Sequence, residues 1–304
     1  MEIPGGAAGG SCNVLCGNWI ASAAERFFNE GETGGMRRIL AAFRADVVQG
    51  ILKRWYVYAL AVLAAVLFAL DSRIQLKPIM ERPGTLDLLA FMLRGAEKYI
   101  PSLQQNRFEL SYGYLTIFGL LGLASGQYAA RAWKERGRVY LLYYGRKSIW
   151  WISKCIWNFC NIVLIYILLF LSVWTVAAVG GNAGMEIGPE LEAASWWSLH
   201  PDRAALLLYI MGSGIITMTA LGQFQMTLQI LFVPVLGFLV YMAVLISSVY
   251  CLSPFLMGNS LMLLRTQLCT PDGVSFGQTV VVGICVWGFS VAAGALGIRK
   301  KDVL

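Results

Sequence analysis

The sequence predicts an all-α integral membrane protein: six transmembrane helices, preceded by an amphipathic interfacial helix, with both termini cytoplasmic. Three observations support this fold class. Hydrophobic residues make up 58% of the 304 residues and charged residues only 13%, against about 25% charged in an ordinary soluble domain. Six long stretches contain no Asp, Glu, Lys or Arg, and the cations gather in alternate connections between these stretches.

The six charge-free stretches are the predicted transmembrane helices. Crossing the bilayer core takes about 20 consecutive apolar residues, and in lipid such a run satisfies its own backbone hydrogen bonds as a helix. The stretches cover residues 55–70, 112–130, 155–180, 204–222, 230–252 and 280–298. The first is the shortest, but Lys53, Arg54 and Arg73 flank it and can extend their charges to the two interfaces. Residues 223–229 are predicted to form a tight turn, and Pro234 is expected to loosen the fifth helix.

Cation counts set the predicted orientation, because cytoplasmic loops carry an excess of Lys and Arg. Residues 36–54, 131–154 and 299–304 hold five, seven and three cations. The three connections assigned outside hold six, one and one, and the six are interleaved with five acids. Both termini are therefore predicted to be cytoplasmic. The formal net charge of +7 follows from this asymmetry, so a nucleic-acid partner is not indicated.

The first 54 residues divide into two parts. Residues 1–35 contain Gly-rich segments and are predicted to be a flexible cytoplasmic extension; the alternative is that translation naturally begins at Met36. Residues 36–54 carry apolar side chains at the spacing of an amphipathic helix, at Ile39, Phe43, Val47 and Ile51. We expect this helix to lie along the cytoplasmic interface with its apolar face in lipid; a soluble cytoplasmic helix is the alternative. Residues 55–304 form the predicted six-span domain.

Several kinds of function lack the residues that they require. No Gly-x-x-x-x-Gly-Lys-Ser/Thr loop is present to bind ATP, and no predicted span contains a carboxylate or a basic residue for ion coupling. The only histidine, His200, lies in an outside loop, so a serine within the membrane has no base to activate it. We therefore expect no catalytic residue, metal site or cofactor in this chain. Cys251 and Cys269 both lie near the outer face and could form a disulfide, although spacing alone does not fix their separation.

Small and polar side chains within the spans predict close helix packing. Asn158 and Asn161 lie three residues apart on one helix and are expected to bond to a neighbouring helix rather than to a cargo. In the second span, Gly119, Gly122 and Gly126 allow another helix to approach closely.

The connection between the second and third spans carries the most specific pattern. Residues 129–158 read AARAWKERGRVYLLYYGRKSIWWISKCIWN, with seven cations, one acid, and a run of two leucines and three tyrosines between them. This mixture suits docking to a protein partner, with an aromatic and aliphatic centre and a charged rim. The alternative is that the cations only fix topology and meet anionic headgroups, with the aromatic residues as an interfacial belt.

The same residues resemble the cytoplasmic loop of permease subunits of type-2 ABC exporters, the ABC-2 type transporter family. That loop reads approximately Glu-Arg-x-x-Gly-Thr, then Leu-Leu, a Ser-Arg turn and a Lys entering the third span. The matching positions are Glu135, Arg136, Gly137, Leu141, Leu142, Arg146 and Lys154. The chain departs from the pattern in its compressed spacing before Gly137, in Arg138 at the threonine position and in Gly145 at the position of the usual serine or proline. The basic tail, residues 295–304, is similar to the tail that closes these permeases.

The resemblance implies a division of labour between subunits. In that family two permeases pair, as a homodimer or a heterodimer, and each docks a cytoplasmic ABC ATPase that binds ATP and Mg²⁺. A short helix in the loop, by position residues 144–152, transmits the movement of the ATPases to the spans. The coupling residues implied are Glu135, Arg136, Gly137, Tyr144, Gly145, Arg146, Lys147, Ser148 and Lys154. The family's first, second and fifth spans line the route, which implies the pathway candidates Tyr112, Tyr114, Phe118, Phe232, Phe238 and Tyr241.

The predicted function is therefore the permease subunit of an ATP-driven exporter, a multi-pass protein of the plasma membrane surrounded by lipid. Spans that lack fixed charge and are rich in aromatic residues favour an amphipathic cargo, such as a peptide antibiotic or a lipid. The main alternative is a membrane scaffold or binding subunit without transport, followed by an ion-coupled carrier and then by an intramembrane enzyme. Copurification of an ATPase encoded beside the gene would separate the first function from the others.

Overall fold

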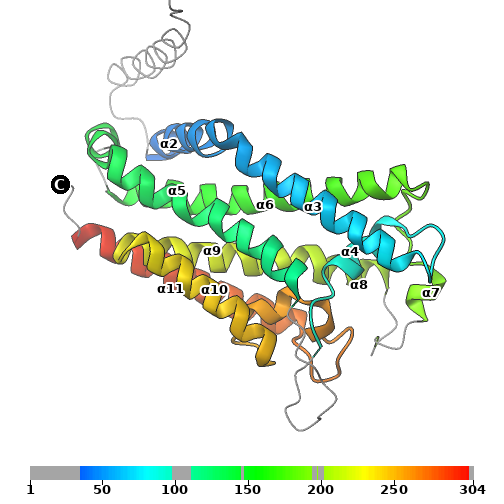
Figure 1. Cartoon of the computed structure of the whole chain (residues 1–304). Coiled ribbons are helices and arrows are strands. Elements are labelled where there is room, and N and C mark those ends of the chain that lie inside the picture. The colour runs from blue at the N-terminus through cyan, green and yellow to red at the C-terminus, as the bar shows by residue number, and fades with distance from the viewer. Residues whose placement is uncertain (1–34, 98–110, 145–146, 194–196, 198–201, 301–304) are drawn as a thin grey trace, which may run out of the picture.

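The computed structural model describes residues 35–97, 111–144, 147–193, 197 and 202–300, and helices account for most of them (Figure 1). These residues contain no β-strand; an isolated bridge joins Thr266 and Val274. The helices are α2 (Gly35–Gly50), η1 (Leu52–Arg54), α3 (Trp55–Leu76), α4 (Thr85–Met92), α5 (Tyr112–Tyr144), α6 (Lys147–Val179), α7 (Pro189–Glu192), α8 (Arg203–Leu207), η2 (Leu208–Ser213), α9 (Gly214–Leu231), α10 (Pro234–Tyr250), η3 (Met257–Leu261), η4 (Leu263–Arg265) and α11 (Phe276–Lys300).

Four helical segments of the described chain are long and apolar enough to cross a membrane, namely Ile39–Leu76, Lys147–Val179, Arg203–Leu231 and Phe276–Arg299. Helix α10 is also apolar but has only 17 residues. Large aliphatic side chains such as Leu60, Leu63 and Leu67 of α3 point away from the protein, as they do when lipid is the surrounding solvent. The predicted class of an all-α membrane protein is therefore confirmed.

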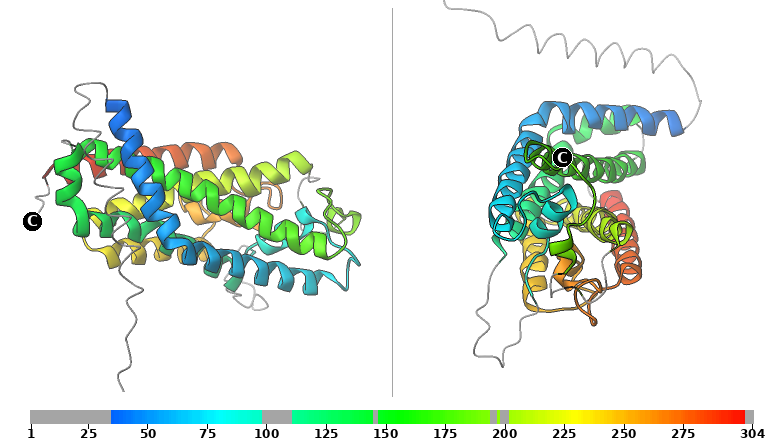
Figure 2. Two further views of the ribbon diagram at one scale, coloured as in Figure 1. Left: turned by 90° about the horizontal axis from the view of Figure 1, so that it is seen from above. Right: turned by 90° about the vertical axis from the view of Figure 1, so that its right-hand side faces the viewer.

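The long helices run side by side, with α9 at the centre of the bundle. Helix α9 packs against α5, α6, α10 and α11, and most of its side chains are buried. In the end-on view of Figure 2, α2 is seen from the side and runs crosswise along one edge of the bundle. It packs mainly on α6 and also touches α5.

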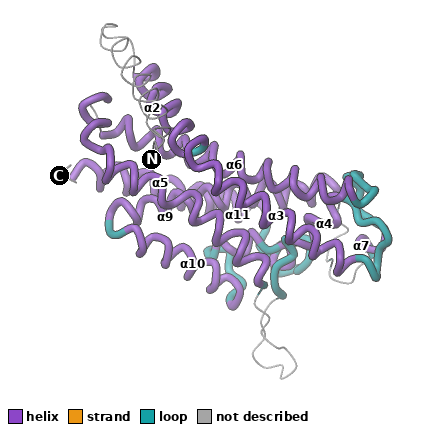
Figure 3. Tube along the Cα trace, turned by 45° about the horizontal axis from the view of Figure 1, so that its top comes forward, coloured by secondary structure: helices purple, strands orange, loops and turns teal. Residues whose placement is uncertain are grey.

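The two ends of the bundle differ in structure (Figure 3). One end holds α2, the start of α6 and the end of α11, where Lys147 Nζ donates to the Arg299 carbonyl at 3.4 Å. We call it the basic end. The other, which we call the loop end, holds α4, α7, α8, η3 and η4. Its loops are held together by backbone hydrogen bonds, from Thr85 N to the Gly184 carbonyl (2.9 Å) and from Leu263 N to the Leu93 carbonyl (3.0 Å).

The predicted boundary between the fourth and fifth helices is wrong. Residues 223–229 belong to α9 and are mostly buried, and the chain turns at Phe232 and Val233 instead. The glutamines of this segment are polar but uncharged, and they do not break a helix. Pro234 begins α10 instead of loosening it, because the first helical position has no intrahelical partner for an N–H.

Candidate functional site

Helices α5 and α6 are both longer than a bilayer core is thick, and both reach the basic end. Each has 33 residues, a contour length of about 50 Å at 1.5 Å per residue, against about 30 Å for the hydrocarbon core. The extension contains the basic residues 131–154 that the sequence singles out. Among its described cations, Arg131 is exposed and Lys147 is half-buried.

Beside this extension lies a buried group of charged and polar side chains that joins α2, α5 and α6. The Asp46 carboxylate of α2 forms an ion pair with Lys154 of α6, and each of these two side chains is only 1% exposed. The hydroxyls of Tyr128 and Ser153 also donate to Asp46, at 2.8 Å and 2.5 Å. We call these four residues the ion-pair cluster. Both carboxylate oxygens therefore have donors, with the Lys154 ammonium on the same oxygen as the Tyr128 hydroxyl.

Aromatic rings enclose the ammonium group of Lys154. Its Nζ lies 4.5 Å from the centroid of the Tyr128 ring and 5.4 Å from that of Trp150, so both faces contribute a cation–π attraction. The Trp157 ring packs 4.3 Å from the Tyr128 ring. These rings exclude water from the ion pair, which is why loss of either charge would leave the other one buried and uncompensated.

Small side chains bring α2 close enough for this contact. Ala42, Asp46 and Gly50 recur at four-residue spacing and are all buried, whereas Leu40, Arg44 and Val48 on the opposite face are exposed. A side chain at Gly50 would overlap the Trp157 indole, since a Cβ there would lie within 2.9 Å of three of its ring atoms. Glycine at this position therefore lets α2 rest directly on α6.

The start of α6 is anchored on its inner side by tryptophans. Trp150 and Trp151 are buried; Trp150 packs 4.8 Å from the Trp133 ring of α5, and the Trp151 indole donates to the Val291 carbonyl of α11 at 2.9 Å. Within the implied coupling element, residues 144–152, Ile152 is exposed and Lys147 and Ser148 are half-buried. Among residues 147–152, the buried side chains of Ile149, Trp150 and Trp151 are continuous with the core of the bundle.

The other implied coupling residues are placed as follows. Glu135, Arg136, Gly137 and Tyr144 lie in the extension of α5, but their side chains fall outside the part of the chain that the structure describes, and so do Gly145 and Arg146 entirely. Lys154 is buried in the ion-pair cluster rather than on the surface. The predicted charge-free stretch, which begins at residue 155, is therefore shorter than α6. The helix begins at Lys147 and includes the buried cation Lys154.

Three of the six pathway candidates meet inside the bundle. Tyr114, Phe118 and Tyr241 are buried; the Tyr241 hydroxyl donates to the Phe118 carbonyl at 2.6 Å, and the Tyr114 and Phe118 rings lie 5.3 Å apart. Phe238 stacks on Tyr241 with ring centroids 6.3 Å apart. Tyr112 and Phe232 are 76% and 59% exposed and belong to opposite ends of the bundle.

At the loop end a buried arginine binds three backbone carbonyls. Arg265 donates from Nε to Ala96 at 2.8 Å and from Nη2 to Glu97 and Val249 at 2.6 Å and 2.7 Å. It thereby joins the segment after α4 to the end of α10. Cys251 and Cys269, at the same end, are not joined by a disulfide.

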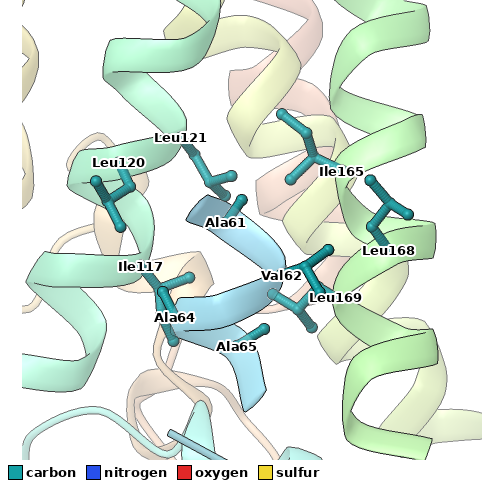
Figure 4. A pocket seen from close by; sticks show the side chains of 10 residues that line it. All are labelled: Ala61, Val62, Ala64, Ala65, Ile117, Leu120, Leu121, Ile165, Leu168 and Leu169. Carbon is teal, nitrogen blue, oxygen red and sulfur yellow. The ribbon is translucent and has the colours of Figure 1, made fainter. Parts of the chain in front are cut away.

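The described helices border two narrow crevices. The first lies between α3, α5 and α6, and Figure 4 shows it lined only by aliphatic side chains, at Ala61, Val62, Ala64, Ala65, Ile117, Leu120, Leu121, Ile165, Leu168 and Leu169. The second, nearer the loop end, is lined by aromatic, aliphatic and hydroxyl side chains that include Phe118, Tyr166 and Ser260. Both are narrow, so they leave no room for a cargo molecule between the packed helices.

Comparison of the chain with protein-family models, with curated proteins and with solved structures found no match. The candidate site therefore rests on the chain's own geometry. Sequence reasoning missed the ion-pair cluster, because Asp46 fits the polar side of an amphipathic helix and Lys154 fits a loop cation. The signal that could have revealed it is the four-residue spacing of Asp46 with Ala42 and Gly50, two small residues suited to a packed face.

Proposed function

We propose that the chain is the membrane-spanning permease subunit of an ATP-driven exporter of the ABC type, without catalytic residues of its own. In this proposal two permease copies, or two related permeases, pair in the plasma membrane. Each docks a cytoplasmic ATPase at the basic end, and the ATPase supplies the ATP and Mg²⁺ chemistry. The cargo is amphipathic, of the kind of a peptide antibiotic or a lipid.

The observation that carries the proposal is the union of the α5–α6 extension with α2 through the ion-pair cluster. A docked ATPase would push on residues 131–152, and the tryptophans and the cluster tie these parts of α5 and α6 to α2 and α11. A loop that only fixed topology would need cations at the surface but no such buried connection. The geometry is therefore suited to pass a displacement from the basic end into the bundle.

The arrangement of the two ends supports six spans. Helix α2, the start of α6, the turn at Phe232 and Val233 and the end of α11 share the basic end, while α4, α7, α8, η3 and η4 share the loop end (Figure 1). Helices α3, α5, α6, α8–α9, α10 and α11 therefore pass between the ends in alternate directions. With the excess of cations on the cytoplasmic side, both termini face the cytoplasm.

The position of the ion-pair cluster argues against an ion-coupled carrier. Such carriers place ionisable groups as relays deep in the membrane. Lys154 instead lies in the third turn of α6, close to the basic end, and its charge is paired with Asp46. The polar side chains one and two turns further along α6, Asn158 and Asn161, are uncharged.

Charge reversal at the basic end tests the proposal. The double change Arg146→Glu and Lys147→Glu should weaken ATPase association by well over tenfold, because reversing desolvated interfacial charges costs about 2–5 kcal/mol. The measurement is the amount of ABC ATPase, expressed from the neighbouring gene, that copurifies from detergent or nanodiscs, together with its ATP hydrolysis. Arg82→Glu with Arg94→Glu is the matched control, since both cations are exposed at the loop end. Equal ATPase association in both double variants would refute docking at this segment.

A further inference from the structure

Helix α9 presents two glutamines toward the seam between α5 and α10. Gln225 and Gln229 lie four residues apart, and therefore on one face of the helix. Gln225 is fully buried and Gln229 is 3% exposed. This is the segment that the sequence assigned to a turn, and burying it places two carboxamides inside a membrane protein.

Most hydrogen-bonding atoms of the two carboxamides have no partner. Gln225 Nε2 donates to the Gly122 carbonyl of α5 at 3.0 Å, but Gln225 Oε1 accepts nothing. Neither Oε1 nor Nε2 of Gln229 has a partner. In an apolar surrounding, unpaired donors and acceptors are strongly unfavourable, so each one in a folded protein requires an explanation.

Glycines on both neighbouring helices make room for these side chains. A Cβ added at Gly126 of α5 would lie 2.6 Å from Gln225 Cδ and 2.8 Å from Gln229 Nε2. A Cβ added at Gly237 of α10 would overlap the Gln229 side chain at Cγ and would lie 2.8 Å from the backbone carbonyl oxygen of Gln225. The carboxamides therefore fill the space behind the seam, with glycine on either side instead of interlocking side chains.

The chemistry of this site selects one class of group. A carboxamide offers one acceptor and two donors and carries no charge. Its natural complement is another amide, with one N–H and one C=O. An acyl chain would leave the three unpartnered atoms unpaired, and an ionised group would find no described counter-charge beside Gln225 and Gln229.

We propose that Gln225 and Gln229 form a hydrogen-bonding site for the uncharged backbone amides of a peptide cargo, exposed when α5 and α10 separate. The route to the site rests on the proposed export function, in which the seam opens toward the pathway. Occupation of the site by an amide does not depend on ATP hydrolysis. Recognition of backbone amides at this site identifies the cargo class as peptide rather than lipid.

A pair of matched probes tests the site in the full chain, reconstituted in nanodiscs without an ATPase. One probe is a fluorescent, uncharged cyclic hexapeptide of leucine and alanine; the other is the same ring with every backbone nitrogen methylated, which keeps the acceptors and removes the donors. The wild type should bind the first probe about tenfold more tightly, the effect of one or two well-made hydrogen bonds. Binding is measured by fluorescence anisotropy.

The double variant Gln225→Met and Gln229→Met should remove this difference between the probes. Without ligand, Gln229→Met alone should melt at a temperature equal to or above that of the wild type, because methionine fills similar space and neither polar atom of Gln229 has a partner to lose. Gln223→Met is the matched control: Gln223 is equally buried on α9 but faces α6, where its Nε2 lies 3.3 Å from Cys155 Sγ. It should keep the wild-type difference between probes.

Three outcomes overturn the site: equal binding of the two probes by the wild type, a difference that persists in the double variant, or a lower melting temperature of Gln229→Met, which marks this glutamine as structural. If the double variant does not fold, Gln229→Met alone carries the same test. Failure of an ATPase to associate with the chain would refute the export function but leave these binding results unaffected.

Discussion

The ion-pair cluster and the buried polar side chains of α9 both lie inside the protein, but they differ in whether their hydrogen bonds are made. Around Asp46, a formal charge meets three donors, and the opposite charge on Lys154 is paired and enclosed by aromatic rings. On α9, uncharged side chains such as Gln225, Gln229 and Thr217 keep atoms without any partner. The ion-pair cluster therefore holds its helices in one fixed contact. The polar side chains of α9 have unpaired atoms in this packing of the helices, and a different packing would let a ligand pair with them.

The difference between a paired charge and an unpaired carboxamide explains how one chain combines rigid and mobile helix contacts inside a membrane. A charged group in a nonpolar surrounding is tolerated only with its partners in place, so the cluster holds α2, α5 and α6 in one geometry. An unpaired carboxamide is unfavourable by much less, and a helix contact built on it can open when a ligand supplies the missing bonds. Displacement from the basic end should therefore move α2 and α6 together and open contacts around α9.

The largest expected effect comes from breaking the ion pair on one side only. Lys154→Met leaves the Asp46 charge buried, and loss of one partner of a buried pair typically destabilises a protein by about 3–5 kcal/mol. The double variant Asp46→Asn with Lys154→Met, which has no buried charge, should recover most of this loss. The measurement is the apparent melting temperature in detergent, followed by size-exclusion chromatography. Lys53→Met, at an exposed position of η1, is the control, and equal melting temperatures for both single variants would contradict the cluster.

A second expected effect separates close helix contact from helix propensity. Gly50→Ala places a Cβ against the Trp157 ring and should destabilise the protein by about 1–3 kcal/mol through overpacking. Gly288→Ala, in α11, meets open space within 4 Å and should stabilise the protein slightly, since alanine favours a helix by about 1 kcal/mol over glycine. Thermal unfolding of the two variants measures the difference. The same sign for both would show that α2 does not rest on α6 as described.

The spans could be predicted from the sequence because hydrophobicity and charge decide them locally. Long apolar runs fix the existence of α3, α6 and α11, and bilayer thickness sets their minimum length. The end of α9 could not be predicted in this way. Glutamine is compatible with a turn and with a buried helix face, and only the neighbouring glycines of α5 and α10 show which applies. Those glycines come from other helices, far from α9 in the sequence.

The candidate site was predicted only in part for a similar reason. The basic extension of α5 and α6 stands out by composition, and Lys154 was among the residues singled out. Its partner Asp46 lies 108 residues earlier, in a helix whose polar residues were assigned to the surface. Amphipathic spacing predicts that a helix has two faces, but it does not distinguish a polar face in water from a polar contact inside the protein. Packing against other helices decides whether a polar face meets water or protein, and the sequence of one helix does not contain that information.

A smaller pair of effects of opposite sign tests the comparison directly, since each change removes one buried hydroxyl. Ser153→Ala removes a donor to the Asp46 carboxylate and should destabilise the protein by about 1–3 kcal/mol. Thr217→Val removes a hydroxyl that has no partner at a fully buried position, and should stabilise it by about 1 kcal/mol. Urea or dodecyl sulfate unfolding in mixed micelles gives both values. The comparison between regions fails if Thr217→Val destabilises as much as Ser153→Ala does.

The smallest expected effect is a pH dependence at the loop end, far from both regions. Asp87 is 1% exposed, and its two carboxylate oxygens accept the N–H groups of Gly84 and Gly188, at 2.8 Å and 2.9 Å. Burial raises the pKa of Asp87 above its ordinary value of 3.8, and these two N–H groups oppose the rise.

Since the folded state then binds the proton more tightly than the unfolded chain, the contribution of Asp87 to stability falls as pH rises from 3.8 through the raised pKa. The asparagine of Asp87→Asn does not titrate, so the wild type should lose stability relative to this variant as pH rises from 3.8 through the raised pKa of Asp87. Melting temperatures of the two proteins across this range give the result, with Asp272→Asn at an exposed position as the control for loss of one negative charge. A wild type that instead gains stability relative to Asp87→Asn over the same range would mean that the two backbone N–H groups outweigh burial at this carboxyl.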